Sequence, residues 1–128
     1  GKVKIGDLGV SVGIQDSEIE VLPMVGSCYW MAPEIIKGLP YGFKADIWSF
    51  GCVLLELANG MPPRFQVPKL KAMVLQVIDG PSGLNEPEKW SHEFQDFVKQ
   101  ALQENPRARP TADELLKHPF IEKACNND

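Results

Sequence analysis

An almost unbroken apolar run near the middle of the chain constrains the fold most. Residues 43–59 leave almost no polar face when they are placed on a helix. Gly60 and the Pro62–Pro63 pair follow at once, and these residues end helices. We therefore expect a helix over 43–59 that is buried on nearly all sides. The run is too short, and too often interrupted by polar residues, to span a membrane.

Further helices are predicted from the spacing of apolar residues. Residues 70–78 and 94–102 repeat them at i, i+3, i+4 and i+7, and Ser91 is a suitable N-cap for the second stretch. Thr111 and Glu114 have the spacing of a capping box, in a helix that we expect Pro119 to end. A short helix is expected over 32–36. The chain should thus be mainly α-helical.

The first residues predict a short β-hairpin. Residues 3–6 and 10–13 read as two strands around a turn, too little sheet to be stable alone. Asp7 lies in that turn between Gly6 and Gly9. A carboxylate at a strand end, on backbone free to bend, suits a metal or phosphate site, but one carboxylate is not a complete site.

Composition excludes several classes of protein. The chain has 128 residues, enough for one domain with a core, and 44% of them are hydrophobic. The net charge of −4 and the absence of any basic run argue against nucleic acid as a partner. The 3 cysteines are widely spaced, which fits neither a disulfide framework nor a zinc site. We therefore expect a reducing, cytoplasmic location and no membrane span.

Four motifs in order carry a family resemblance. They are DLG at 7–9, APE at 32–34, DIWSFG at 46–51 and NPRARPTADELLKHPF at 105–120. Together they resemble the C-terminal half of a eukaryotic protein kinase domain, most like the Sterile-twenty-like, germinal-centre and Hippo-type serine/threonine kinases. The resemblance implies a helical C-lobe with a short β-hairpin remnant, taken from an α+β fold of two lobes. It divides the chain into metal-binding loop strands (1–13), an activation segment (14–34) and a helical C-lobe (35–128).

The resemblance gives the opening turn a role in holding ATP and Mg²⁺. The aspartate that matches Asp7 binds Mg²⁺ between the β- and γ-phosphates, and Gly9 belongs to the same cofactor-binding loop. The plain alternative is a turn aspartate with no ligand. Leu8 replaces the phenylalanine usual in this motif, a change also found in active members of the group.

The resemblance also places a substrate loop at Gly26, Ser27 and Trp30. A hydroxyl at the position of Ser27 helps to shape the acceptor site of serine/threonine kinases, so the implied partners are protein substrates with Ser or Thr acceptors. Regulatory proteins are further possible partners. The plain alternatives are a small turn residue at Ser27 and core packing for Trp30.

Three residues are implied as structural anchors. Glu34 resembles a glutamate that forms a buried ion pair with an arginine near the end of the domain, which matches Arg109, whereas Arg107 is expected to be solvated. Asp46 lies on an otherwise apolar helix and needs hydrogen bonds if it is buried. Its kinase counterpart accepts them from the backbone of the catalytic loop.

Activation by phosphorylation is expected to differ from the group. The threonine usually phosphorylated three residues before Gly26 is replaced by Pro23. Ser17 and Ser27 remain as candidate phosphosites, and acidic residues already surround Ser17. We expect activation to depend less on this loop's phosphorylation, or to use Ser17.

No catalytic residue is expected within these 128 residues. The Gly-rich loop, the strand lysine, its helix glutamate, the catalytic aspartate and the second metal-binding asparagine all precede the DLG motif in family order, so we expect them upstream of Gly1. The expected function is part of a serine/threonine protein kinase, with the isolated chain inactive. The alternative is a pseudokinase or truncated helical module that acts as an interaction scaffold.

Overall fold

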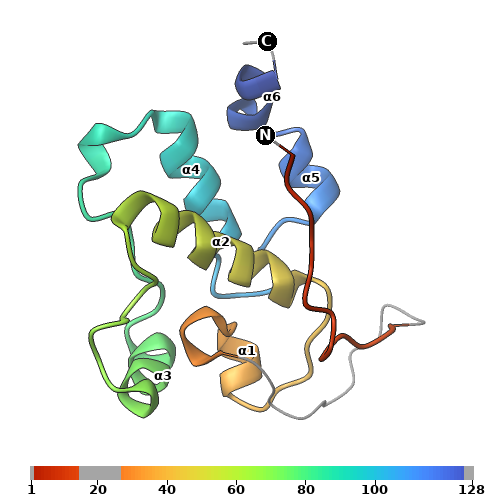
Figure 1. Ribbon diagram of the computed structural model, residues 1–128, viewed down its shortest axis with the longest axis vertical. Coiled ribbons are helices and arrows are strands. Elements are labelled where there is room, and N and C mark those ends of the chain that lie inside the picture. Colours follow the sequence, from red (N-terminus) through yellow and green to blue (C-terminus); the bar gives the residue numbers. More distant parts are fainter. Residues whose placement is uncertain (1, 15–26, 126–128) are drawn as a thin grey trace.

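The computed structural model describes residues 2–14 and 27–125, and its regular elements are all helical (Figure 1). No strand occurs within these two ranges, so the prediction of a mainly α chain is confirmed. The elements are the 3₁₀ turns η1 (Cys28–Trp30) and η2 (Pro87–Lys89) and the helices α1 (Pro33–Ile36), α2 (Lys44–Asn59), α3 (Lys69–Ile78), α4 (His92–Ala101), α5 (Ala112–Leu116) and α6 (Pro119–Cys125).

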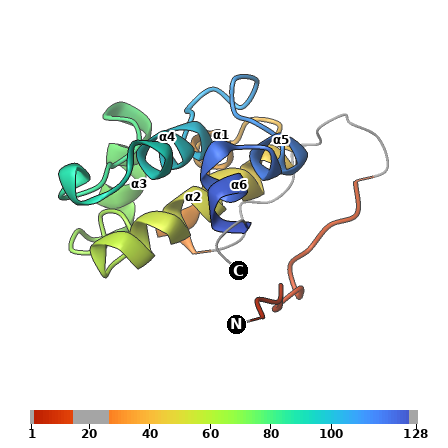
Figure 2. The same cartoon turned by 90° about the horizontal axis from the view of Figure 1, so that it is seen from above.

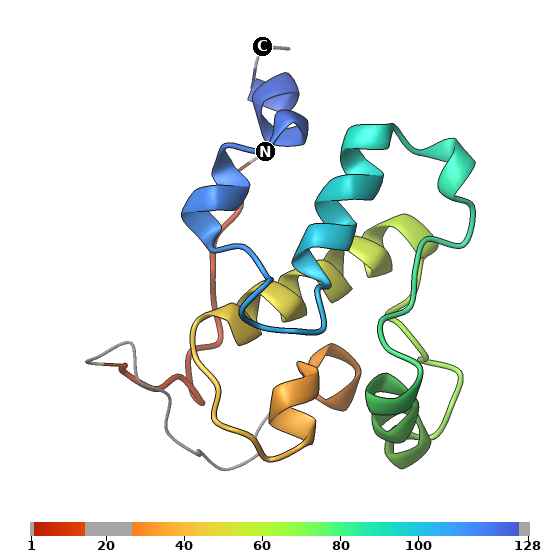
Figure 3. The same ribbon diagram turned by 180° about the vertical axis from the view of Figure 1, so that it is seen from behind.

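Helix α2 is the centre of the molecule. It ends as expected at Gly60, whose φ of +81° is accessible to glycine and whose N–H donates to the carbonyl of Glu56. Trp48, Cys52 and Leu55 on this helix are fully buried. α4 crosses α2 on one side, and α1 lies on another side (Figure 3). The helical body therefore packs around α2.

The expectation that α2 is buried on nearly all sides is wrong. Phe50, Val53 and Leu57 are 41%, 40% and 77% exposed. Their spacing of three and four residues places them on one face of the helix. An apolar side chain shows that a position can be buried, but burial also needs a covering segment. The described residues cover this face only in part: the ring of Phe50 packs edge-on against Phe97, whereas Leu57 stays exposed. We call it the uncovered face of α2.

The expected β-hairpin is also absent. Residues 2–14 form no strand, and residues 2–13 are exposed. The only regular feature there is a turn in which the N–H of Ser11 donates to the carbonyl of Leu8, at 3.1 Å. Seen from above, the segment lies apart from the helices (Figure 2). Two short strands with no third strand or helix against them bury too little surface to remain paired.

Helices α4 and α5 begin as their caps predict. Ser91 accepts from the N–H of Phe94 at the start of α4, and Thr111 and Glu114 form the reciprocal capping box of α5. The backbone N–H of Thr111, and to a smaller extent its hydroxyl, donate to the Glu114 carboxyl and hold its pKa below the ordinary value. Pro119 does not end α5, which stops at Leu116, but begins α6. Proline suits a first helical position because it has no N–H to leave unpaired.

A histidine fixes α6 against α4. His118 is buried, its Nδ1 accepts from the N–H of Phe120, and its Nε2 lies 2.9 Å from Oδ2 of Asp96. Because Nδ1 accepts, the proton of the neutral ring is on Nε2, which donates to Asp96. The ring centres of Phe94 and Phe97 each lie 5.1 Å from that of Phe120.

No helix in the described ranges is long and apolar enough to cross a membrane.

Replacing Gly51 by alanine should destabilise the fold. A Cβ at this position would lie 2.8 Å from Cγ of Leu102 and 3.1 Å from Cβ of Ala101, closer than packed atoms normally approach. We expect Gly51→Ala to lower the free energy of unfolding by about 1–2 kcal/mol, measured by urea denaturation. Gly83→Ala is the control, because a Cβ there meets no atom within 4 Å. Equal effects of the two changes would contradict the packing argument.

The Asp96–His118 contact should make part of the free energy of unfolding vary with pH in the acidic range. The hydrogen bond from His118 holds the pKa of Asp96 below its ordinary value of 3.8. A depressed carboxyl pKa adds stability above the unfolded value, and that stability is lost as the pH falls through the lower folded pKa. The difference in unfolding free energy between the parent and Asp96→Asn should therefore shrink from about pH 5 to about pH 2. Glu88→Gln, which removes an exposed carboxylate, should show no comparable narrowing.

Candidate functional site

A buried ion pair joins α1 to the segment before α5. Nη1 of Arg109 lies 2.7 Å from Oε1 of Glu34, and Nη2 lies 3.1 Å from Oε2, so the contact is bidentate. Arg109 is 0% and Glu34 4% exposed. The two residues are 75 positions apart in the chain. The structure thus brings together the two anchors that the family resemblance pairs.

Every donor of Arg109 has an acceptor. Its Nε donates to the carbonyl of Gln103 at 2.9 Å, Nη1 also donates to that of Lys44 at 2.6 Å, and Nη2 to that of Glu104 at 3.4 Å. The guanidinium also lies 5.2 Å from the ring centre of Trp48. Because a buried charge is costly unless all its hydrogen bonds are made, this complete set stabilises one arrangement of three segments.

The C-terminal end of the expected substrate loop, at Trp30, is fixed to α2. The indole Nε1 of Trp30 donates to Oε2 of Glu56 at 3.0 Å, and Oγ of Ser49 donates to the carbonyl of Trp30 at 2.8 Å. Trp30 is half-buried against the core, which favours the packing interpretation. Ser27 is exposed at the start of η1, and its side chain makes no cap hydrogen bond. Gly26 lies outside the described residues.

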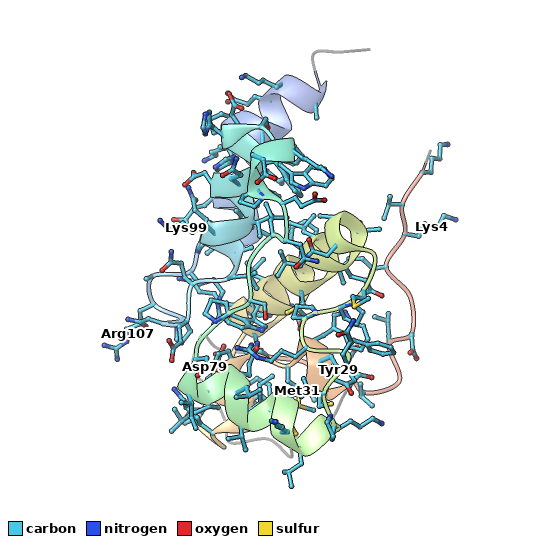
Figure 4. The ribbon with its side chains drawn as sticks, turned by 90° about the vertical axis from the view of Figure 1, so that its left-hand side faces the viewer. Lys4, Tyr29, Met31, Asp79, Lys99 and Arg107 are labelled. Carbon is cyan, nitrogen blue, oxygen red and sulfur yellow. The ribbon has the colours of Figure 1, made fainter. Side chains whose placement is uncertain are left out.

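Tyr29 ties the same segment to the connection between α2 and α3. Its hydroxyl donates to the carbonyl of Val67 at 3.0 Å, and its ring lies 5.4 Å from that of Phe65. Figure 4 shows Tyr29 and Met31 beside α3. Sequence reasoning missed Tyr29, Ser49 and Glu56. The available signal was weak: polar residues on the apolar α2 needed partners, but nothing in the sequence said which ones.

The opening turn contributes one carboxylate to the expected cofactor site. Asp7 is exposed and has a φ of +58°, and Gly9 follows in the turn. Within residues 2–14 and 27–125 no group of three or more His, Cys, Asp or Glu side chains is arranged to hold a metal. Since Mg²⁺ needs several oxygen ligands, the described residues do not by themselves fit a complete Mg²⁺ site. Ser17, the other candidate phosphosite, lies outside the described residues.

Asp46 lies on the uncovered face of α2. It is exposed, and its positions relative to Phe50, Val53 and Leu57 place all four on one stripe of the helix. No side-chain hydrogen bond to Asp46 occurs among the described residues. A role as the anchor of a catalytic loop therefore stays a prediction.

The buried thiol of Cys52 is not a reactive group. Burial raises the pKa of Cys52 to about 12, with the nearby Arg109 charge acting in the opposite direction. The nucleophilic form of cysteine is the thiolate, which is negligible at neutral pH for such a group. His92 is exposed and His118 is structural, so neither is placed as a catalytic base.

Comparisons with known proteins agree with the motifs. The family model described as "Protein kinase domain" matches residues 1–121. Two relatives from Dictyostelium discoideum are "Serine/threonine-protein kinase dst3", 48% identical over 98% of this chain, and "Serine/threonine-protein kinase 4 homolog A", 45% identical over 97%. "Serine/threonine-protein kinase 10" from Danio rerio is 40% identical over 99%.

The chain belongs to the protein kinase domain family, and its resemblance to the Sterile-twenty-like and Hippo-type members is confirmed. It spans only part of each relative: 27% of the kinase 4 homolog, 22% of dst3 and 14% of kinase 10. The helical fold is that expected of a kinase C-lobe.

Breaking the ion pair should be costly, whereas removing a neighbouring charge should not. Glu34→Ala leaves the Arg109 charge buried without its carboxylate, so we expect the free energy of unfolding to fall by about 3–5 kcal/mol. Arg107→Ala is the matched control, because Arg107 is exposed and points away from the helices (Figure 4). It should change stability by less than about 0.5 kcal/mol. Both values are measured by urea denaturation, and similar values for the two variants would contradict this role of the pair.

Proposed function

We propose that this member of the protein kinase domain family is the C-terminal half of the kinase domain of a serine/threonine protein kinase. The reaction of the complete domain is transfer of the γ-phosphate of ATP to Ser or Thr hydroxyls of protein substrates. The proposal is supported by the order of the DLG, APE and DIWSFG motifs and by the serine/threonine kinases among its relatives. A reducing, cytoplasmic location is proposed with it.

The observation that carries the proposal is the uncovered face of α2. A carboxylate, Asp46, begins a stripe that is otherwise apolar, continuing through Phe50, Val53 and Leu57. A segment that covers this stripe must supply hydrogen-bond donors at one end and apolar contacts along the rest. We propose that the catalytic loop of a complete kinase domain is that segment, and that its backbone N–H groups donate to Asp46.

In the complete domain Asp7 is one ligand of Mg²⁺, and Gly9 lets the backbone approach the phosphates of ATP. Bound Mg²⁺ neutralises phosphate charge, while the residues of this chain position the acceptor. Gly26 and Ser27 form the acceptor end of the substrate loop. Its other end is held at Trp30 by Glu56 and Ser49. Activation in this proposal depends less on phosphorylation of the activation segment than in the group it resembles, or uses Ser17, and Ser27 is the other candidate phosphosite.

A second candidate is a non-catalytic scaffold that binds substrate or regulatory proteins. It would apply if the complete protein lacked the Gly-rich phosphate loop and the catalytic aspartate that the resemblance leads one to expect. Phosphoryl transfer depends on positioning several charged groups together. The isolated chain should therefore transfer no phosphate under either candidate, and only the sequence encoded before Gly1 separates them.

The first test is phosphate transfer with labelled ATP and Mg²⁺ on mixed Ser, Thr and Tyr peptides. We expect no transfer by the 128-residue chain, and transfer to Ser and Thr alone by a protein that includes the coding sequence upstream of Gly1. Asp7→Asn should lower this activity about a hundredfold or more. Asp113→Asn, an exposed aspartate at the start of α5, should leave it unchanged.

Four outcomes would contradict the proposal or a part of it. Transfer by the 128-residue chain would contradict its predicted inactivity. Transfer to Tyr would contradict the assignment to serine/threonine kinases. An upstream sequence without a catalytic aspartate, asparagine and strand lysine would establish the scaffold instead. Mapping of phosphate on active protein to Ser27 alone would contradict the role given to Ser17.

A further inference from the structure

A cleft lies between helix α4 and the connection that leads to it from α3, residues 79–91. The cleft has a volume of about 680 Å³, with residues 81–87 on one side and α4 with residues 102–104 on the other. Figure 3 shows the connection running beside α4 before it turns into that helix. Among the described residues, none from the four family motifs lines the cleft. It is therefore separate from the surfaces that carry the proposed kinase function.

Two side-chain amides fix the connection in place. The amide of Asn59 donates to the carbonyl of Gly83 at 3.2 Å and accepts from the N–H of Asn85 at 3.0 Å. Nearer α4, Nε2 of Gln95 donates to the carbonyl of Pro87 at 2.8 Å. Because these bonds hold the connection on both sides of the cleft, the cleft is formed before any ligand binds. Preformed cavities of roughly 300–1,000 Å³ are typical of small-molecule sites.

The lining of the cleft is apolar at depth and polar at the rim. Val98 and Leu102 are buried, and the partly buried Leu84 packs against the core. The exposed ionisable side chains of the lining are those of His92, Asp96, Lys99 and Glu104. This arrangement suits a molecule with an apolar body and a polar end.

Lys99 is the charged group at the rim that can accept a new partner (Figure 4). The carboxylates in and next to the walls already have partners: Asp79 with Arg64, Glu86 with Lys89, Glu93 with Lys123, Asp96 with His118 and Glu104 with Lys37. The exposed Glu88 does not line the cleft. In the part of the chain that the structure describes, no carboxylate forms a salt bridge with Lys99. Its ammonium group is thus available to an anion.

We propose that this cleft binds an amphipathic monocarboxylate, a small molecule with an aromatic or aliphatic body and one carboxylate. The body lies against Leu84, Val98 and Leu102, and the carboxylate accepts a hydrogen bond from the ammonium of Lys99. Asp96 precedes Lys99 by three positions on α4, so its negative charge lies close to the bound anion. Repulsion from this charge favours an anion with one charge over a phosphate monoester, which carries nearly two.

The probe is 2-naphthoate, and the neutral 2-naphthamide and the more highly charged 2-naphthyl phosphate are compared with it. Binding to the isotope-labelled 128-residue chain is measured by NMR titration. We expect 2-naphthoate to shift the signals of Leu84, Val98 and Leu102, with a dissociation constant of about 1 mM or lower. The signals of Leu57, which is 77% exposed on α2, should stay unchanged. The amide and the phosphate should each bind at least about threefold more weakly.

The role of the cation is tested with a matched pair of variants. Lys99→Gln should weaken binding of 2-naphthoate about threefold and leave binding of 2-naphthamide unchanged, because it removes only the charge. Lys117→Gln makes the same change at an exposed lysine that does not line the cleft, and it should have no effect on either probe. Added salt should weaken binding of the carboxylate more than that of the amide. Circular dichroism of each variant checks that the helices are intact. None of these measurements involves phosphate transfer, so their outcome does not depend on the activity test.

Five results would overturn the proposal. They are no binding of 2-naphthoate at millimolar concentration, signal shifts on the uncovered face of α2 instead of in the cleft, equal binding of the carboxylate and the amide, tighter binding of the phosphate than of the carboxylate, and equal losses in Lys99→Gln and Lys117→Gln. The second would show that the probe adheres to exposed apolar surface without using the cleft.

Discussion

The guanidinium of Arg109 is the constraint on which the arrangement of the helices depends. Apolar packing is not directional, so the contacts of Trp48, Leu55 and their neighbours allow several ways of placing α1 on α2. The five donors of a planar guanidinium allow very few. The set of acceptors from Glu34, Lys44 and residues 103–104 is complete only when three distant segments meet at one point.

This constraint explains how so short a helix as α1 can be held. Four residues do not form a stable helix by themselves, because the entropy lost in ordering the first turn exceeds the stabilisation from its hydrogen bonds. Glu34 ties α1 to Arg109, while Trp30, just before it, is tied to α2 through Glu56 and Ser49. The conformation of the segment from η1 to α1 is therefore fixed by its contacts with the helical body. Rigid scaffolds commonly position binding loops in this way.

What could be predicted from the sequence depended on whether the cause was local. The caps at Ser91 and Thr111 and the end of α2 at Gly60 are decided within a few residues, and all three predictions are confirmed. The hairpin over 3–13 and the burial of α2 on nearly all sides both require other segments to pack against them. The local residue pattern does not show whether such segments are present, and both predictions are wrong. The pairing of Glu34 with Arg109 came from family motifs, because a separation of 75 residues carries no local signal. Pro119 was misread since proline ends one helix and begins another equally well.

The uncovered face of α2 and the cleft beside α4 differ in the chemistry that can cover them. Burial of Asp46 against an apolar segment leaves a charge without donors, so the occupant of the α2 face must bring N–H groups to a fixed point and is likewise fixed in register. Lys99 stays solvated at the rim of the cleft, so an occupant there gains only weak attraction from its charge and can exchange readily. The first surface is suited to a permanent contact within a domain, and the second to a small ligand that binds reversibly. Two surfaces of similar apolar character thus differ in the charges beside them, and these charges decide what can cover each surface.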